Sequence, residues 1–218
     1  FVKDVADVVV KAAPADLDAL LAANYPNTDK TVGEMIPEKV LVIGENLKVR
    51  RFARYATGVT VPYIHMAGRI GVLVNMEVEG IDAAAVTELG KDLCMQVAAM
   101  NPSFCDKADV DQTTLDKEKE IQLALMDNDP KMASKPLQVK EKIVLGKMSK
   151  YYGENCLMQM EFVKEKGVSV EQHVAAIAKE LGGKISVKSF VRFERGEGIE
   201  KKQEDFAAEV AAQMNMGK

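Results

Sequence analysis

One segment of this sequence occurs twice. Residues 47–55, LKVRRFARY, resemble residues 185–193, ISVKSFVRF, with Val, Phe and Arg identical at matching positions. The similarity extends backwards without a gap, because residues 31–46 align on residues 169–184. Any two half-buried strands share a period of two, but they have no reason to share the segment that precedes them. The chain therefore contains an internal duplication, which its fold has to accommodate.

Each copy of the duplicated segment predicts a helix followed by a strand. Thr31 and Ser169 are placed to cap the two helices, since hydroxyl side chains accept hydrogen bonds from the first helical amides. Gly44 and Gly182 follow an apolar residue at the far ends, where a left-handed glycine commonly ends a helix. Pro37 lies inside the first helix, and we expect it to kink or delay that helix.

The two predicted strands alternate between apolar and charged residues, which separates a core face from an outer face. The predicted core face takes the odd positions: Leu47, Val49, Ala53 and Tyr55 in one copy, and Ile185, Val187, Val191 and Phe193 in the other. Phe52 and Phe190 fall among lysines and arginines on the other face. Either another layer of the domain covers these rings, or they belong to a mixed aromatic and basic contact surface.

Residues 61–78 predict a β-hairpin between the copies. An extended arm runs to His65, Gly68 lies in the turn, and an apolar strand continues over residues 70–74. Together with residues 185–193 this hairpin would make a small antiparallel sheet. By symmetry the first copy needs a hairpin of its own, and we expect that Phe1 lies inside a longer protein whose first unit is cut.

The remaining segments predict helices, so the fold class is α+β. Residues 82–100 have an apolar stripe at helical spacing, and residues 111–152 read as two charged helices around the turn NDPKMASKP. The predicted architecture has two repeated subdomains with small antiparallel sheets packed by helices. Its parts are a truncated first subdomain (1–58), a second subdomain (59–110 and 153–195), an inserted antiparallel helical hairpin (111–152) and a C-terminal helical module (196–218).

Composition and motifs exclude several classes of function. The formal net charge is −4, which does not favour a nucleic-acid backbone as partner, and no apolar run is long enough to span a membrane. We expect a soluble, cytoplasmic protein. Cys94, Cys105 and Cys156 lack CxxC spacing and are interpreted as reduced packing residues. The sequence shows no nucleophile–base pair, metal cluster or GxxxxGK[ST] phosphate loop, so we predict neither an enzyme nor a cofactor of its own.

Three separated motifs, IGENLKVRRF, YIHMAGRIGVLV and FERGEGIEKKQEDFAAEVAAQ, together resemble the elongation factor Ts family of bacterial translation. The resemblance covers essentially the whole chain. It implies two repeated core subdomains, a dimerisation hairpin and a C-terminal module. It also implies a function, which is to bind elongation factor Tu and promote release of its GDP. The family's N-terminal helical domain has no counterpart before Phe1, and Phe1 and Val2 match only the end of the loop that in the family helps disturb the partner's Mg²⁺ and phosphate site. The cut loop puts full exchange activity of these residues in doubt.

The resemblance further implies which residues contact the partner. They lie at the end of the first repeated helix, around the hairpin turn and at the start of the chain: Phe1, Ile43, Gly44, His65, Met66, Gly68, Arg69 and Gly71. Met66 stands where the family usually has glycine. Without the resemblance, Ile43 would be an ordinary core residue and His65 a surface or capping residue.

The helical hairpin is the predicted site of self-association. Four apolar residues are expected to hold it together and to help two copies associate: Leu115, Ile121, Ile143 and Met148. His173 in the second repeated helix is interpreted as a packing residue. Two alternatives to an exchange factor remain. Lys48, Arg50 and Arg54 suggest an RNA- or ribosome-binding module, and the helical hairpin suggests a structural dimer without exchange activity.

Overall fold

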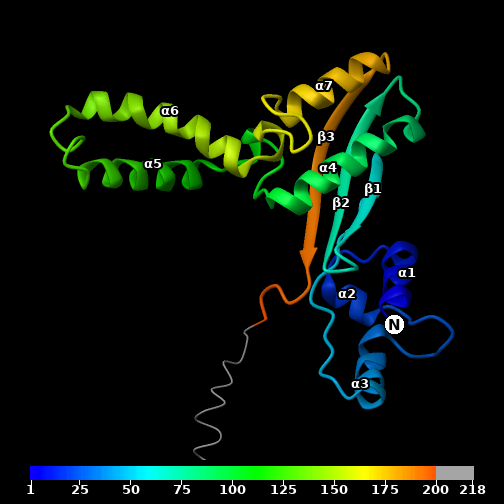
Figure 1. Ribbon diagram of the computed structural model, residues 1–218. Helices are drawn as coiled ribbons and strands as arrows, with labels where there is room; N and C mark the ends of the chain where they lie inside the picture. The colour runs from blue at the N-terminus through cyan, green and yellow to red at the C-terminus, as the bar shows by residue number, and fades with distance from the viewer. Residues whose placement is uncertain (200–218) are drawn as a thin grey trace, which may run out of the picture.

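The computed structural model describes residues 1–199, which form an α+β fold as predicted (Figure 1). Three helices at the N-terminus precede a three-stranded sheet, and a helical hairpin projects from the side of that sheet. The elements, in chain order, are α1 (Val2–Ala12), α2 (Leu17–Ala22), α3 (Val32–Ile43), β1 (Val59–His65), β2 (Ile70–Glu79), α4 (Thr87–Met100), α5 (Gln112–Asp127), α6 (Leu137–Asn155), α7 (Val170–Glu180) and β3 (Lys184–Glu194).

The sheet confirms the predicted hairpin and its third strand. Its order is β1-β2-β3 and both pairs are antiparallel, with His65 opposite Ile70 and Ile70 opposite Glu194. One face of β2 is buried through Val72, Val74 and Met76, because α4 and α7 contribute to the same apolar core. The hairpin turn lies at the end of the sheet nearer to α1, α2 and α3 (Figure 1).

The two repeated helices begin and end in the same way, as the duplication predicts. Two residue pairs form capping boxes: Thr31 with Glu34, and Ser169 with Gln172. In each pair, the side chain of either residue accepts a hydrogen bond from the backbone amide of the other. Gly44 and Gly182 adopt left-handed φ angles of 78° and 73° after the helices end. These conformations favour glycine because it has no Cβ.

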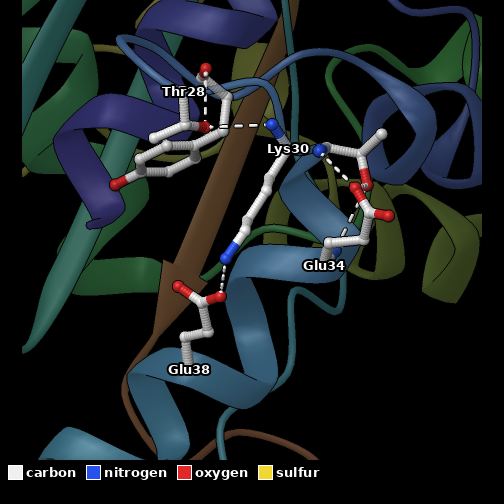
Figure 2. Close-up of polar contacts among 6 residues, drawn as sticks. Thr28, Lys30, Glu34 and Glu38 are labelled. Carbon is white, nitrogen blue, oxygen red and sulfur yellow. Dashed lines mark hydrogen bonds and ion pairs between the residues drawn. The ribbon is translucent and has the colours of Figure 1, made fainter.

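Pro37 neither delays nor interrupts α3, contrary to our expectation. The helix begins at Val32, directly after its cap, and continues through Pro37 to Ile43. Figure 2 shows the polar contacts around this start, where Lys30 Nζ also pairs with Glu38. The Glu34 amide donates to Thr31 Oγ1 over 3.2 Å, and the Thr31 amide donates to Glu34 Oε2 over 2.7 Å. The capping contacts therefore set the beginning of α3.

The first predicted strand does not form, which corrects the sequence analysis. Residues 47–55 run without regular secondary structure, and no strand within residues 1–199 pairs with them. A strand needs a partner for its amides and carbonyls, and the hairpin of β1 and β2 pairs with β3 instead. Val49 and Phe52 pack against the core of α1, α2 and α3, beside a groove of about 590 Å³ along α1.

The second predicted strand forms, but its apolar residues do not all share one face. Asn75 pairs with Ser189 and Met76 with Val187, so Lys188 is an extra residue in β3 and makes a β-bulge. Ile185 and Val187 face the core before the bulge, and Phe190 faces it afterwards. The odd positions Val191 and Phe193 consequently lie on the other face, beside Pro62, Ile64 and Leu73.

The helical hairpin forms as predicted from α5 and α6, with its own small core. Met126, Val144 and Met148 are buried there, and Leu115 and Ile143 pack against them. Ile121 does not hold the hairpin together, because its side chain is 53% exposed and lies outside this core. The predicted C-terminal helix lies mostly outside the described residues.

The cysteines and the second histidine are packing residues. Burial raises the pKa of the Cys94 and Cys105 thiols to about 12 and that of Cys156 to about 11, so all three stay protonated at neutral pH. His173 stacks on Phe162 with 4.1 Å between ring centroids. No helix within residues 1–199 is long and apolar enough to cross a membrane.

Candidate partner-binding site

The turn between β1 and β2 has an unusual backbone. Met66, Ala67 and Gly68 have φ angles of 48°, 51° and 92°. Successive positive φ values match the right-handed twist of a hairpin, but a non-glycine residue in this region costs roughly 1–2 kcal/mol. The Arg69 amide donates to the carbonyls of His65 and Met66, each over 3.1 Å, and holds the turn. Strain of this kind is often retained at functional sites.

The side chains at this turn expose apolar surface. Met66 is 61% exposed and Ile64, two residues earlier in β1, is 66% exposed. The resemblance predicted Met66, but Ile64 was missed. A strand residue whose neighbours Tyr63 and His65 face the core side must point the other way, so the period of two could have indicated it. Ile64 and Met66 thus give this end of the sheet two exposed apolar side chains.

His65 is half-buried at the end of β1, on the same face as the core residue Ile70 opposite it. The Tyr63 hydroxyl and His65 Nδ1 are hydrogen-bonded over 2.9 Å, and the two ring centroids are 5.7 Å apart. A histidine near a hairpin turn could be a simple surface residue. In the structure its ring instead has a side-chain partner at Nδ1.

Arg69 connects the turn to the end of β3. Its Nε atom lies 3.3 Å from Glu194 Oε1, and Arg192 Nη2 lies 2.8 Å from Glu194 Oε2. Hydrogen bonds from Arg192 and then Arg69 keep the pKa of the Glu194 carboxyl below its ordinary value. The Arg195 amide also donates to the Arg69 carbonyl over 2.8 Å. The ion pair and the backbone hydrogen bond thus connect the hairpin turn to the end of β3.

The predicted residues at the end of α3 lie in a larger apolar patch. Leu41 is 84% exposed, Val42 83% and Ile43 53%, and Gly44 then ends the helix with its amide donating to the Val40 carbonyl. Leu41 and Val42 were missed. Three successive apolar residues cannot all lie on one helical stripe, so this run at a glycine stop was the signal that some of them are exposed.

The predicted contact residues come from three separate segments of the chain. His65, Met66, Gly68, Arg69 and Gly71 lie in or beside the hairpin turn, whereas Ile43 and Gly44 lie at the end of α3. Phe1 packs on the core of α1, α2 and α3 and stacks on Tyr25 with 6.1 Å between centroids.

The basic stripe of the first copy is partly engaged within the chain. Arg50 Nη1 donates to the Glu197 carbonyl, and Arg51 Nη2 lies 2.6 Å from Glu197 Oε2. The Arg51 guanidinium also stacks over the Phe193 ring, 4.2 Å from its centroid. Phe52 is half-buried against the core of α1, α2 and α3. These contacts favour the packing interpretation for Phe52 and engage Arg50 of the basic stripe within the chain.

Comparison with known proteins gives the chain relatives throughout its length. The model of the family described as elongation factor TS matches residues 1–197. Elongation factor Ts of Syntrophotalea carbinolica is 41% identical over 214 residues, which are 97% of this chain and 69% of that protein. The protein of the same name from Clostridium kluyveri is 42% identical over 98% of this chain and 69% of its own length.

A third relative, elongation factor Ts of Clostridium botulinum, is 45% identical over 204 residues, covering 92% of this chain and 65% of that protein. The chain thus spans about two thirds of the length of these relatives. The match includes the repeated helices, the hairpin turn with His65, and α5 and α6. This chain belongs to the elongation factor Ts family.

Proposed function

We propose that this chain binds elongation factor Tu and promotes release of GDP from it during translation elongation. The observation that carries the proposal is the family match over residues 1–197. Two surfaces of the structure support it. The end of α3 and the β1–β2 turn both present apolar side chains on backbone that is fixed by hydrogen bonds.

The task of such a protein is set by linkage. A GTPase that holds GDP with nanomolar affinity has about 12 kcal/mol of binding free energy to overcome. A factor that weakens nucleotide binding must, by reciprocity, bind the nucleotide-free partner more tightly than the loaded one by the same coupling energy. Rigid contact elements suit this task, because a mobile surface would lose part of that coupling energy on ordering.

Hydrogen bonds support both surfaces. The Gly44 amide donates to the Val40 carbonyl where α3 ends, and the contacts of Arg69 with Glu194 connect the hairpin turn to β3. The nucleotide belongs to the partner in this proposal. Calorimetry of the isolated chain with GDP is expected to show no binding heat, and saturable micromolar binding of GDP would contradict the proposal.

The direct test is the rate of GDP release from elongation factor Tu, followed by stopped flow with increasing amounts of this chain. His65→Ala is expected to weaken stimulated release and partner binding by about 1–2 kcal/mol, the range of an interface contact below hot-spot rank. The matched control is His173→Ala, which removes the other histidine.

His173 stacks on Phe162, which belongs to the apolar core of the sheet with α4 and α7. The control should therefore lower the melting temperature and leave partner binding unchanged. His65→Ala should show the opposite pattern. If His65→Ala leaves both binding and release unchanged, the hairpin turn is not a contact surface for elongation factor Tu.

Self-association through the helical hairpin is a second part of the proposal. Exposed apolar residues support it: Ile121, Leu125, Leu137 and Leu145 are all more than half exposed on α5 and α6. An RNA- or ribosome-binding role is the competing function. A filter-binding assay would reveal it as RNA affinity that falls steeply with salt, and the expected result is no such affinity.

A further inference from the structure

We infer that Tyr63 is a positioning residue for His65, and that its hydroxyl fixes which ring nitrogen of His65 faces a protein partner. The inference rests on the proposed function, since it deepens the role of the same turn. It names a residue that the family resemblance did not include and the chemistry that the partner must offer in return.

The geometry places the two side chains together at the end of β1. Residues two apart in a strand point to the same face, and the Tyr63 hydroxyl lies 2.9 Å from His65 Nδ1. The Tyr63 ring packs against the main apolar core. A ring held in the core can anchor a neighbour, whereas a fully solvated one would lose conformational entropy to do so.

The chemistry of the two groups sets the direction of this hydrogen bond. A phenol hydroxyl is a stronger donor than acceptor, and a neutral imidazole offers one nitrogen lone pair as a good acceptor. The Tyr63 hydroxyl therefore donates to Nδ1, which leaves the proton of His65 on Nε2. The ring then presents an N–H donor to a partner.

The group that this donor recognises on a partner is an acceptor, either a carbonyl oxygen or a carboxylate. The neighbouring surface agrees with a protein partner, because Met66 beside His65 is apolar and 61% exposed. A hydrogen bond bordered by apolar contacts is shielded from water, which strengthens it. An oriented Nε2–H would thus contribute specificity at an otherwise apolar turn.

The first test reads the tautomer without any partner. Nitrogen-15 NMR of the isolated chain at mildly alkaline pH should show Nε2 of His65 protonated and Nδ1 unprotonated. Tyr63→Phe removes only the hydroxyl and should give a mixture of the two tautomers. A protonated Nδ1 in the unmodified chain, or an unchanged spectrum in Tyr63→Phe, would overturn the inference.

The second test asks whether Tyr63 acts through His65. Tyr63→Phe should weaken binding to elongation factor Tu about three- to tenfold, because the hydrogen bond that orients His65 is lost. In a His65→Ala background the same substitution should have no further effect, because its target is absent. Tyr152→Phe, on α6, is the matched control and should leave binding unchanged. An equal effect of Tyr63→Phe in both backgrounds would overturn the inference.

A third pair of variants identifies the nitrogen that contacts the partner. His65→Gln places an amide N–H near the position of Nε2, and His65→Asn places one near Nδ1. We expect Gln to retain more partner binding than Asn, and the reverse order would contradict the assignment. If the unmodified chain does not bind elongation factor Tu, the proposed function fails, while the NMR result still decides how Tyr63 orients His65.

Discussion

The two copies of the duplicated segment share their helices but differ in the residues after them. Helices α3 and α7 both begin with a capping box and are both succeeded by a left-handed glycine. After Gly182 the chain enters β3 and pairs with β2 over its whole length, whereas residues 47–55 stay without regular structure. The same local pattern thus leads to a strand in one copy and to an irregular segment in the other.

The difference separates local from non-local causes of structure. A helix satisfies its own backbone, and its caps lie within three or four residues, so a copied sequence copies the structure. A strand satisfies its backbone on a neighbouring chain segment, so its sequence is necessary but not sufficient. Residues 47–55 find apolar contacts through Val49 and Phe52 but no ladder partner among residues 1–199.

The largest expected effect comes from disrupting β2, the strand that pairs with the second copy. Val74 is fully buried in the central strand, and Val74→Asp would bury an unpaired carboxylate at a cost of about 4 kcal/mol. Val49, in the irregular segment of the first copy, is half-buried, and Val49→Asp should cost about 1 kcal/mol. Urea unfolding measures both, and equal losses would mean that residues 47–55 are packed as tightly as the sheet that pairs with the second copy.

The helical hairpin is inserted between β2 and β3, and two isoleucines separate its folding from its assembly. Ile143→Asp places a charge against the core of α5 and α6 and should cost about 2 kcal/mol of stability. Ile121→Asp alters an exposed site and should leave stability within about 0.5 kcal/mol. If the hairpin self-associates through its exposed face, sedimentation will show that Ile121→Asp weakens assembly. An unchanged assembly state for both variants would remove this role.

The helix caps should respond equally in both copies. Thr31→Ala and Ser169→Ala each remove a side-chain acceptor from a capping box, and each should cost about 1 kcal/mol. The measurement is thermal unfolding of the two variants and of the double variant. If the two helices are structurally equivalent, we expect the two single variants to lose similar amounts of stability. A loss confined to one copy would show that the helices differ as much as the strands do.

The smallest effect is expected at alkaline pH, in the helices that precede the first copy. The Tyr25 hydroxyl donates to Asp4 Oδ2, and this bond raises the pKa of Tyr25 to about 12. A raised folded-state pKa contributes stability that is complete below the unfolded value near 10 and is lost as the pH rises to about 12. The stability difference between the unmodified chain and Tyr25→Phe should shrink over that window. A constant difference would show that Tyr25 does not titrate with folding.

Much of the fold could be predicted from the sequence because its signals are local. The caps at Thr31 and Ser169, the turn at Gly68 and the helical periodicities all depend on nearby residues, and all formed as predicted. The expectation that Pro37 would delay α3 failed as well, because a capping box begins that helix at Val32. Two other failures were non-local. The strand at 47–55 depended on a partner, and the face of Phe193 depended on a bulge at Lys188 that no period of two can reveal.

The candidate site shows the same division. The resemblance indicated His65, Met66 and Ile43, because motifs preserve residue identity at a position. Neither motif nor periodicity indicated that Tyr63 hydrogen-bonds His65, since a half-buried tyrosine in a strand usually only packs. The exposure of Leu41 and Val42 was also missed, because it depends on which side of α3 the rest of the chain covers.

The bulge at Lys188 has a consequence for how duplicated units become joined. Without that one extra residue, Phe193 would turn toward α4 and α7, and its ring could not meet the Arg51 guanidinium of the first copy. The contact between the two copies thus depends on which face of β3 carries Phe193. Because residues 47–55 align on residues 185–193 without a gap, this change of face needs no inserted residue: a bulge in the pairing can turn an inherited side chain from its own unit toward its sister unit, with no change in that residue's identity. Single insertions and deletions in β3 would move Phe193 away from Arg51. They are therefore constrained by a residue about 140 positions away in the sequence.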